Sequence, residues 1–237
     1  MSGDEPAVCA PAGDAVTAAI PPIVPLGEAA WTVVLGDRVD RSIHERVTML
    51  AGWIDTSRLP GVIEVVPAYA AVTVFFDPRQ ADALLLRQRL AALASEASDR
   101  QLERPSAASP FRQITIPVRY DGPDLAFVAS RTGLSTDEVI RRHSGREYRV
   151  YLLGFAPGFA YLGDLDPALV LPRRSVPRTR VPAGSVAIAG EQTGVYPLAT
   201  PGGWHLIGST PLAMFDPARE PAVLLQAGDR VRFEAIA

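Results

Sequence analysis

The stretch that decides the fold is GFAPGFAYLG, which occupies residues 154–163. It shows no helical periodicity, and glycines and prolines interrupt it. From residue 154 to residue 211 the chain holds nine glycines and eight prolines, with short apolar runs such as Val186-Ala187-Ile188 between them. Frequent turns between short strands are typical of a β-barrel or a β-sandwich. We therefore expect the C-terminal half to be a β domain.

The residues before this stretch show the apolar periodicities of helices and strands. Two sets of apolar residues recur at helical spacing: Ile43, Val47, Leu50 and Ile54, and then Ala83, Leu86, Leu90 and Leu93. Between them lie two β-branched segments, 62–66 and 71–76, and a further strand pattern occupies 31–35. The order β-α-β-β-α is most of a ferredoxin-like sandwich. Nearer the β domain, Ser135 and Glu138 form a capping box, which predicts a helix that ends at Gly145.

These patterns divide the chain, and the predicted fold class is α+β. We expect a flexible leader at 1–28, an N-terminal α/β domain at 29–97, a polar linker at 98–110 and the β domain at 111–237. The leader is rich in proline, alanine and glycine, and the linker is polar and contains two prolines.

The candidate site residues gather in the turn-rich region. Pro157-Gly158 and Pro201-Gly202 each suit the centre of a type II turn, whose N–H groups can hold an anion. Aromatic side chains could line a pocket around that anion, and arginines could bind it in bidentate fashion. The candidates are Phe155, Pro157, Gly158, Phe159, Tyr161, Arg173, Arg178, Gln192, Tyr196, Pro201, Gly202, Gly203, Trp204 and His205.

Each candidate also has a plainer interpretation, which the sequence leaves open. The turns can simply reverse the chain, the aromatic residues can be core, and the arginines can be solvated. His205 is either an acid or base near neutral pH or a structural residue.

Composition excludes several kinds of chemistry. The chain contains no lysine, so it forms no Schiff base, carries no biotin on lysine and has no P-loop lysine. Cys9 is the single cysteine, and the three histidines are far apart in sequence, so we expect no metal site. The net charge of −3 favours no nucleic-acid partner. No secretory signal or membrane span is visible, and we expect a cytoplasmic protein.

Three long clusters carry a resemblance to a known family. They are GFAPGFAYLGDL at 154–165, PRRSVPRTRVPAGSVAIAG at 172–190 and QTGVYPLATPGGWHLIGSTPLAMFDP at 192–217. The chain resembles the family of B-type subunits of 5-oxoprolinase, also called allophanate hydrolase subunit 1, which includes the Kip-type sensor-kinase inhibitor. His205 stands where the family often has glutamine, which leaves the three clusters intact. The resemblance identifies no catalytic residue.

The resemblance implies a cyclophilin-like β-barrel after the small α/β domain. It also implies a hydrolase: ATP-dependent opening of 5-oxo-L-proline to L-glutamate, performed together with a closely paired C-type subunit and an A-type subunit. ATP is then expected to bind mainly to those partner subunits. Two alternatives stay open, inhibition of a sensor histidine kinase and a role as a subunit in urea or allophanate metabolism.

Overall fold

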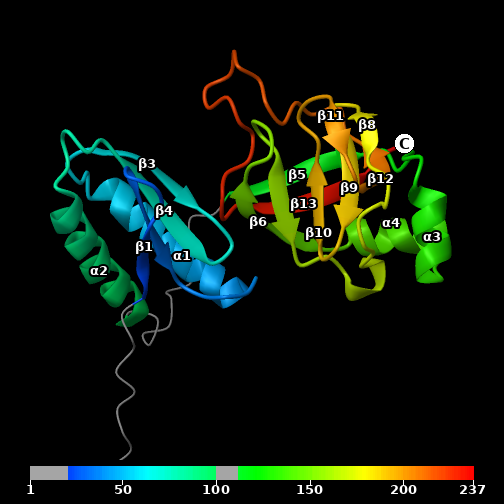
Figure 1. Ribbon diagram of the computed structural model, residues 1–237. Coiled ribbons are helices and arrows are strands. Elements are labelled where there is room, and N and C mark those ends of the chain that lie inside the picture. The colour runs from blue at the N-terminus through cyan, green and yellow to red at the C-terminus, as the bar shows by residue number, and fades with distance from the viewer. Residues whose placement is uncertain (1–20, 100–111) are drawn as a thin grey trace, which may run out of the picture.

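The computed structural model describes residues 21–99 and 112–237, which form an α/β unit and a barrel-like unit (Figure 1). Residues 1–20 of the predicted leader and 100–110 of the predicted linker lie outside the described residues. Within these described ranges, no helix is long and apolar enough to span a membrane.

The first unit is an antiparallel sheet covered by two helices. Its strands β1 (Ile23–Pro25), β2 (Ala30–Val34), β3 (Val62–Pro67) and β4 (Ala71–Phe76) lie in the order β1-β2-β4-β3. Along β4, Val72, Val74 and Phe76 are buried while Thr73 and Phe75 face the other side. This alternation shows that the helices cover one face of the sheet.

Both predicted helices are confirmed. Helix α1 (Arg41–Thr56) begins at Asp40, whose side chain accepts hydrogen bonds from the N–H groups of Ser42 and Ile43 at 2.8 and 3.1 Å. Such a cap satisfies amides that have no partner within the helix. Its four predicted apolar positions are all buried. Helix α2 (Ala83–Asp99) packs beside α1 in the same core.

Two element boundaries differ from the predicted domain limits. The leader was expected to reach residue 28, but Ile23–Pro25 pairs with Trp31–Val33 as strand β1. The strand follows Pro21-Pro22 and ends in Pro25, so its three residues carry too short a pattern to be recognised. The pairing with β2 stabilises them. The linker was expected to begin at 98, but α2 continues to Asp99.

The second unit is a nearly closed, barrel-like sheet. Its order is β12-β9-β10-β7-β6-β13-β5, and β5 (Gln113–Val118) runs parallel to β13 (Arg230–Ala235). Backbone hydrogen bonds between Arg119 and Ser209, at 2.8 and 2.7 Å, connect the two ends of the sheet. The remaining strands of this sheet are β6 (Glu147–Leu153), β7 (Ala160–Gly163), β9 (Ser185–Ala189), β10 (Gln192–Val195) and β12 (His205–Ser209).

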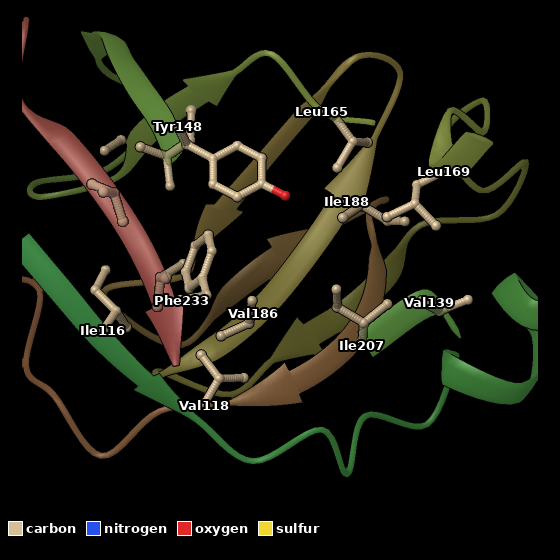
Figure 2. Packing of buried hydrophobic residues seen from close by; sticks show 14 of the residues in the cluster. Ile116, Val118, Val139, Tyr148, Leu165, Leu169, Val186, Ile188, Ile207 and Phe233 are labelled. Carbon is tan, nitrogen blue, oxygen red and sulfur yellow. The ribbon is translucent and has the colours of Figure 1, made fainter. Parts of the chain in front are cut away.

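The interior of this sheet is filled by apolar side chains. Figure 2 shows Ile116, Val186, Ile207 and Phe233 pointing into a common core, and all four are almost completely buried. Two helices, α3 (Leu125–Thr132) and α4 (Thr136–Ser144), pack beside the sheet (Figure 1). They add residues such as Val139 to this core (Figure 2). The predicted cap of α4 is confirmed, since Ser135 Oγ accepts a hydrogen bond from the N–H of Glu138 at 3.2 Å.

A chain of hydrogen bonds crosses this core through His143. Thr193 Oγ1 donates to Ala187 O at 3.0 Å, so it must accept from His143 Nε2, which lies 2.8 Å away. His143 Nδ1 is therefore the acceptor for the Tyr120 hydroxyl at 2.8 Å. Burial lowers the pKa of His143 to about 3, so the ring stays neutral and joins α4 to the sheet.

The two units contact each other through polar groups. His44 of α1 is fully buried, and its Nε2 donates to Tyr151 O in β6 at 2.7 Å. Beside it, Glu45 pairs with Arg149 at 2.9 Å. Burial lowers the pKa of His44 to about 4; the hydrogen bond to Tyr151 O raises it, the positive charge of Arg149 lowers it further, and the negative charges of Glu45 and Asp164 raise it. The contact therefore uses a neutral histidine.

This contact should weaken in mild acid. Because the pKa of His44 falls from 6.5 in the unfolded chain to about 4 in the folded one, the unfolded chain binds more protons between these values. We expect the free energy of unfolding to be fully maintained above pH 6.5 and to lose up to about 3 kcal/mol as the pH falls towards 4. His44→Gln keeps a donor for Tyr151 O but does not titrate. Denaturant unfolding of both proteins across this range gives the two pH profiles. Parallel profiles would contradict the assignment of this pH dependence to His44.

Candidate functional site

An aromatic cluster lies outside the barrel core. Phe159 is at its centre, with ring centroids 4.9 Å from Tyr161, 5.3 Å from Tyr196 and 5.5 Å from Trp204. The cluster packs on Ala187 and Ala189 of β9, whereas the alternate residues of β9 enter the barrel. Successive side chains of a strand face opposite sides, so the aromatic residues lie on the outer face of the sheet. Phe159, Tyr196 and Trp204 are themselves buried there and form a second small core.

The loop at 154–159 presents Phe155 at the edge of this cluster. Phe155 has a φ of 67° and an exposed fraction of 61%. The predicted turn at Pro157-Gly158 is confirmed, because Gly158 has a φ of 81° and the N–H of Phe159 donates to Ala156 O at 3.0 Å. The N–H of Ala156 likewise donates to Gly154 O at 2.8 Å. These two amides are used within the loop and do not hold an anion.

The predicted turn at Pro201-Gly202 is wrong. Thr200–Gly202 forms strand β11, which pairs with β8 (Arg178–Val181), and Gly202 is absent from the described residues with positive φ. Gly202 is instead required by packing, since a Cβ at this position would overlap the hydroxyl and ring of Tyr196. Gly203 has more room, and its nearest neighbour would be Pro177 Cγ at 3.7 Å.

Arg178 is engaged by a carboxylate of its own chain. Its Nη1 and Nη2 donate to Asp124 Oδ2 and Oδ1, both at 2.8 Å, and Arg174 Nη1 donates to Oδ1 at 3.1 Å. The N–H of Leu206 donates to Oδ2 at 2.7 Å. Burial raises the pKa of Asp124, but the hydrogen bonds from Arg178 and Leu206 and the arginine charges outweigh it and hold the pKa below its usual value. Asp124 had no sequence signal beyond its place before α3.

Arg173 presents a positive charge beside the aromatic cluster. The backbone on both sides is fixed, because Pro172 O accepts from His205 Nε2 at 2.9 Å and the N–H of Arg174 donates to Gly203 O at 2.8 Å. The guanidinium of Arg173 lies over the Trp204 ring, 6.0 Å from its centroid. No acidic side chain in the described part of the chain forms an ion pair with it. The geometry therefore leaves Arg173 available to an anion.

His205 has a structural position. It is 4% exposed, and its ring stacks on Phe127 with centroids 5.3 Å apart. Because Nε2 faces the Pro172 carbonyl it must carry the proton, and Nδ1 is buried without a partner among the described residues.

Gln192 reaches the first unit. Its Nε2 donates to the hydroxyl of Tyr69 at 2.6 Å, and Tyr69 lies in the turn between β3 and β4. The Tyr69 ring lies 6.4 Å from Tyr161, whose ring is in turn 5.9 Å from Trp204. Tyr69 was not predicted from the sequence, because nothing local indicates that a hairpin tip meets a residue more than one hundred positions away.

The structure thus brings most of the predicted site residues together. Phe155, Phe159, Tyr161, Tyr196 and Trp204 form one cluster, Arg173 lies over it, and Gln192 borders it through Tyr69. Two hollows lie elsewhere: one of about 560 Å³ between Leu59 and α2, and one of about 460 Å³ beside Arg232 and Ser144. Among the residues that the structure describes, no group of three or more His, Cys, Asp or Glu could hold a metal ion.

Gly202→Ala should destabilise the aromatic cluster because the new methyl group meets Tyr196. We expect a loss of about 1–3 kcal/mol in the free energy of unfolding. Gly203→Ala is the matched control, since its methyl group would make only ordinary contacts, and it should be close to neutral. Thermal unfolding of the two variants measures the difference. Equal stabilities would show that Gly202 does not contact Tyr196 as described.

Comparison with known proteins gives the family. Residues 21–225 match the model of the carboxyltransferase domain, subdomain C and D. The B-type subunit of 5-oxoprolinase from Bacillus subtilis (strain 168) is 42% identical over 228 residues, covering 89% of this chain and 91% of that protein. The protein of the same name from Escherichia coli O157:H7 is 47% identical over 212 residues, covering 88% and 93%.

A solved structure agrees with these matches. The crystal structure of TTHA0988 superposes with a TM-score of 0.77 at 42% identity, covering 88% of this chain. The chain spans only 40% of the length of TTHA0988. Both the sequence and the fold therefore lead to one conclusion: this chain belongs to the family of B-type subunits of 5-oxoprolinase, within the carboxyltransferase subdomain C and D proteins.

Proposed function

We propose that this chain is the B-type subunit of an ATP-dependent 5-oxoprolinase, which opens 5-oxo-L-proline to L-glutamate. The support is that relatives with this name match about nine tenths of this chain and of their own length. The proposed reaction hydrolyses a lactam, a stable amide that needs activation before water attacks it.

The observation that carries this proposal into the structure is Arg173. A guanidinium that is not paired with an acidic side chain of the described chain suits the carboxylate of 5-oxoproline. Burial raises the pKa of the Tyr196 hydroxyl, while the N–H of Trp204 and the charge of Arg173 partly lower it. Tyr196 therefore stays protonated and lies within the electrostatic reach of Arg173. In the proposed complex, the ring of the lactam packs on Tyr161, which is partly exposed and contacts Trp204 beside this charge.

The groups considered at the candidate site do not suit ATP. A triphosphate requires several cations or free backbone amides. Here Arg174 and Arg178 are held by Asp124, and two amides of the 154–159 loop are used within that loop. We therefore propose that ATP binds to the partner subunits.

The partners in this proposal are a C-type subunit, closely paired with the barrel, and an A-type subunit. The matched region of TTHA0988 is part of a much longer chain, which supports a function alongside further domains. Exposed apolar side chains beside the site, Phe155 at 61% and Val176 at 72%, suit a covering subunit. We propose that the C-type subunit covers part of segments 154–161 and 172–186.

The fold of each unit is proposed to follow the same family. The sheet order β1-β2-β4-β3 with two helices on one face supports a ferredoxin-like unit, in which β1 takes the edge position. The seven-stranded, nearly closed sheet supports a cyclophilin-like barrel.

Reconstitution tests the function. We expect the purified chain alone to be inactive, because the groups for ATP activation are proposed to lie in the partners. Mixed with its C-type and A-type subunits, it should release glutamate from 5-oxoproline and hydrolyse ATP in response to it. Activity of the lone chain would overturn the assignment of ATP activation to the partner subunits. An assembled complex that releases no glutamate would overturn the proposed function.

Arg173→Gln tests the anion site in that complex. Removal of a charge-assisted contact with the substrate carboxylate should raise the KM for 5-oxoproline about ten- to hundredfold. Arg131→Gln on α3 is the control, because Arg131 is also exposed and is not a member of the aromatic cluster. Steady-state kinetics of both variants gives the result. An unchanged KM in the Arg173 variant would remove Arg173 from the site.

A further inference from the structure

The hydroxyl of Tyr69 accepts a hydrogen bond from the barrel-like unit. Gln192 Nε2 can only donate, so in the 2.6 Å contact the Tyr69 oxygen is the acceptor. Among the described residues no group accepts the proton of the Tyr69 hydroxyl. Tyr69 is partly buried, and its hydroxyl accepts one hydrogen bond while its own proton can be donated to a ligand.

Ring contacts connect Tyr69 to the candidate site. Tyr69 contacts Tyr161, Tyr161 contacts Trp204, and Arg173 lies over Trp204. Burial raises the pKa of the Tyr69 hydroxyl, and the hydrogen bond from Gln192 and the charge of Arg173 partly lower it. Tyr69 therefore remains a protonated donor within the electrostatic field of Arg173.

We infer that Tyr69 is a substrate-binding residue supplied by the first unit, whose hydroxyl donates to the carboxylate that Arg173 binds. This inference rests on the proposed function and extends it. The site is then shared between the units, and the contact of His44 and Glu45 with β6 keeps the tip of the β3–β4 hairpin over the barrel. One charged and one neutral donor from different directions would select a carboxylate of fixed orientation.

A purely structural explanation makes a different prediction. If the bond from Gln192 only held the units together, loss of the Tyr69 hydroxyl would lower stability and affect all ligands alike. Tyr151 offers a matched comparison. Its ring lies 5.9 Å from Tyr69 at the same contact, but its hydroxyl donates to Asp164 Oδ1 at 3.1 Å.

The experiment compares Tyr69→Phe with Tyr151→Phe in the reconstituted complex. We expect Tyr69→Phe to raise the KM for 5-oxoproline about tenfold or more, with kcat unchanged, since the contact is made in the ground and transition states alike. Inhibition by 2-pyrrolidinone, the same lactam ring without the carboxylate, should keep its inhibition constant. Tyr151→Phe should leave both values as they are, and thermal unfolding should show that both variants are folded.

Each outcome decides between the explanations. An unchanged KM in Tyr69→Phe, while Arg173→Gln still raises it, would overturn the inference and leave the proposed function standing. Equal changes in both tyrosine variants, or an equal weakening of 2-pyrrolidinone, would also overturn it, because the effect would then belong to the contact between the units. An assembled wild-type complex without glutamate release would instead remove the proposed function itself.

Discussion

The buried carboxylate of Asp124 holds the segment on which the candidate site is built. Only 4% of Asp124 is exposed, yet four hydrogen bonds from Arg174, Arg178 and the N–H of Leu206 reach its two oxygens. A buried carboxylate without such partners would be strongly unfavourable. One charge therefore ties a loop, strand β8 and strand β12 to the start of α3.

The position of Arg173 follows from this arrangement. The loop at 172–177 has no regular secondary structure, but its neighbours on either side are fixed: Arg174 by Asp124 and Gly203, and Pro172 by His205. The guanidinium of Arg173 consequently lies over Trp204 without an acidic partner in the described part of the chain. A binding group is most effective when its surroundings are already ordered before the ligand arrives. The Arg–Asp network thus orders the backbone around a cation that lies beside a largely buried aromatic cluster.

Local patterns in the sequence were sufficient for much of this fold. The helical spacing at Ile43–Ile54 and the helix start at Ser135 depend on neighbours within a few residues, and both are confirmed. Of the predicted capping box, the bond from the N–H of Glu138 to Ser135 Oγ is present, whereas the Glu138 carboxylate pairs with Arg141 and Arg142. Pro201-Gly202 predicts a turn but lies in a strand, because proline and glycine occur both in turns and in irregular strands. In β11, Pro201 lies where the pairing with β8 shifts register, so its missing N–H costs no regular ladder bond.

The site itself depended on pairs that are distant in the sequence. Asp124 and Arg178 are separated by 54 positions, and Tyr69 and Gln192 by 123. Periodicity and turn chemistry carry no information about such pairs, so the predicted site contained Arg178 and Gln192 without Asp124 and Tyr69. The aromatic residues are easier to find because all five lie in the turn-rich region between residues 155 and 204.

The sequence contains no lysine, and the contacts of Arg173, Arg174 and Arg178 depend on properties that lysine does not have. Arg178 uses two nitrogens of one planar group to bind both oxygens of Asp124, while Arg174 still reaches one of them. An ammonium group is a compact, strongly hydrated point charge and would not span both oxygens in this way. The same planarity and weaker hydration let Arg173 lie against the face of Trp204. Arginine therefore performs two distinct tasks in one segment: it neutralises a buried charge, and it presents an exposed cation over Trp204.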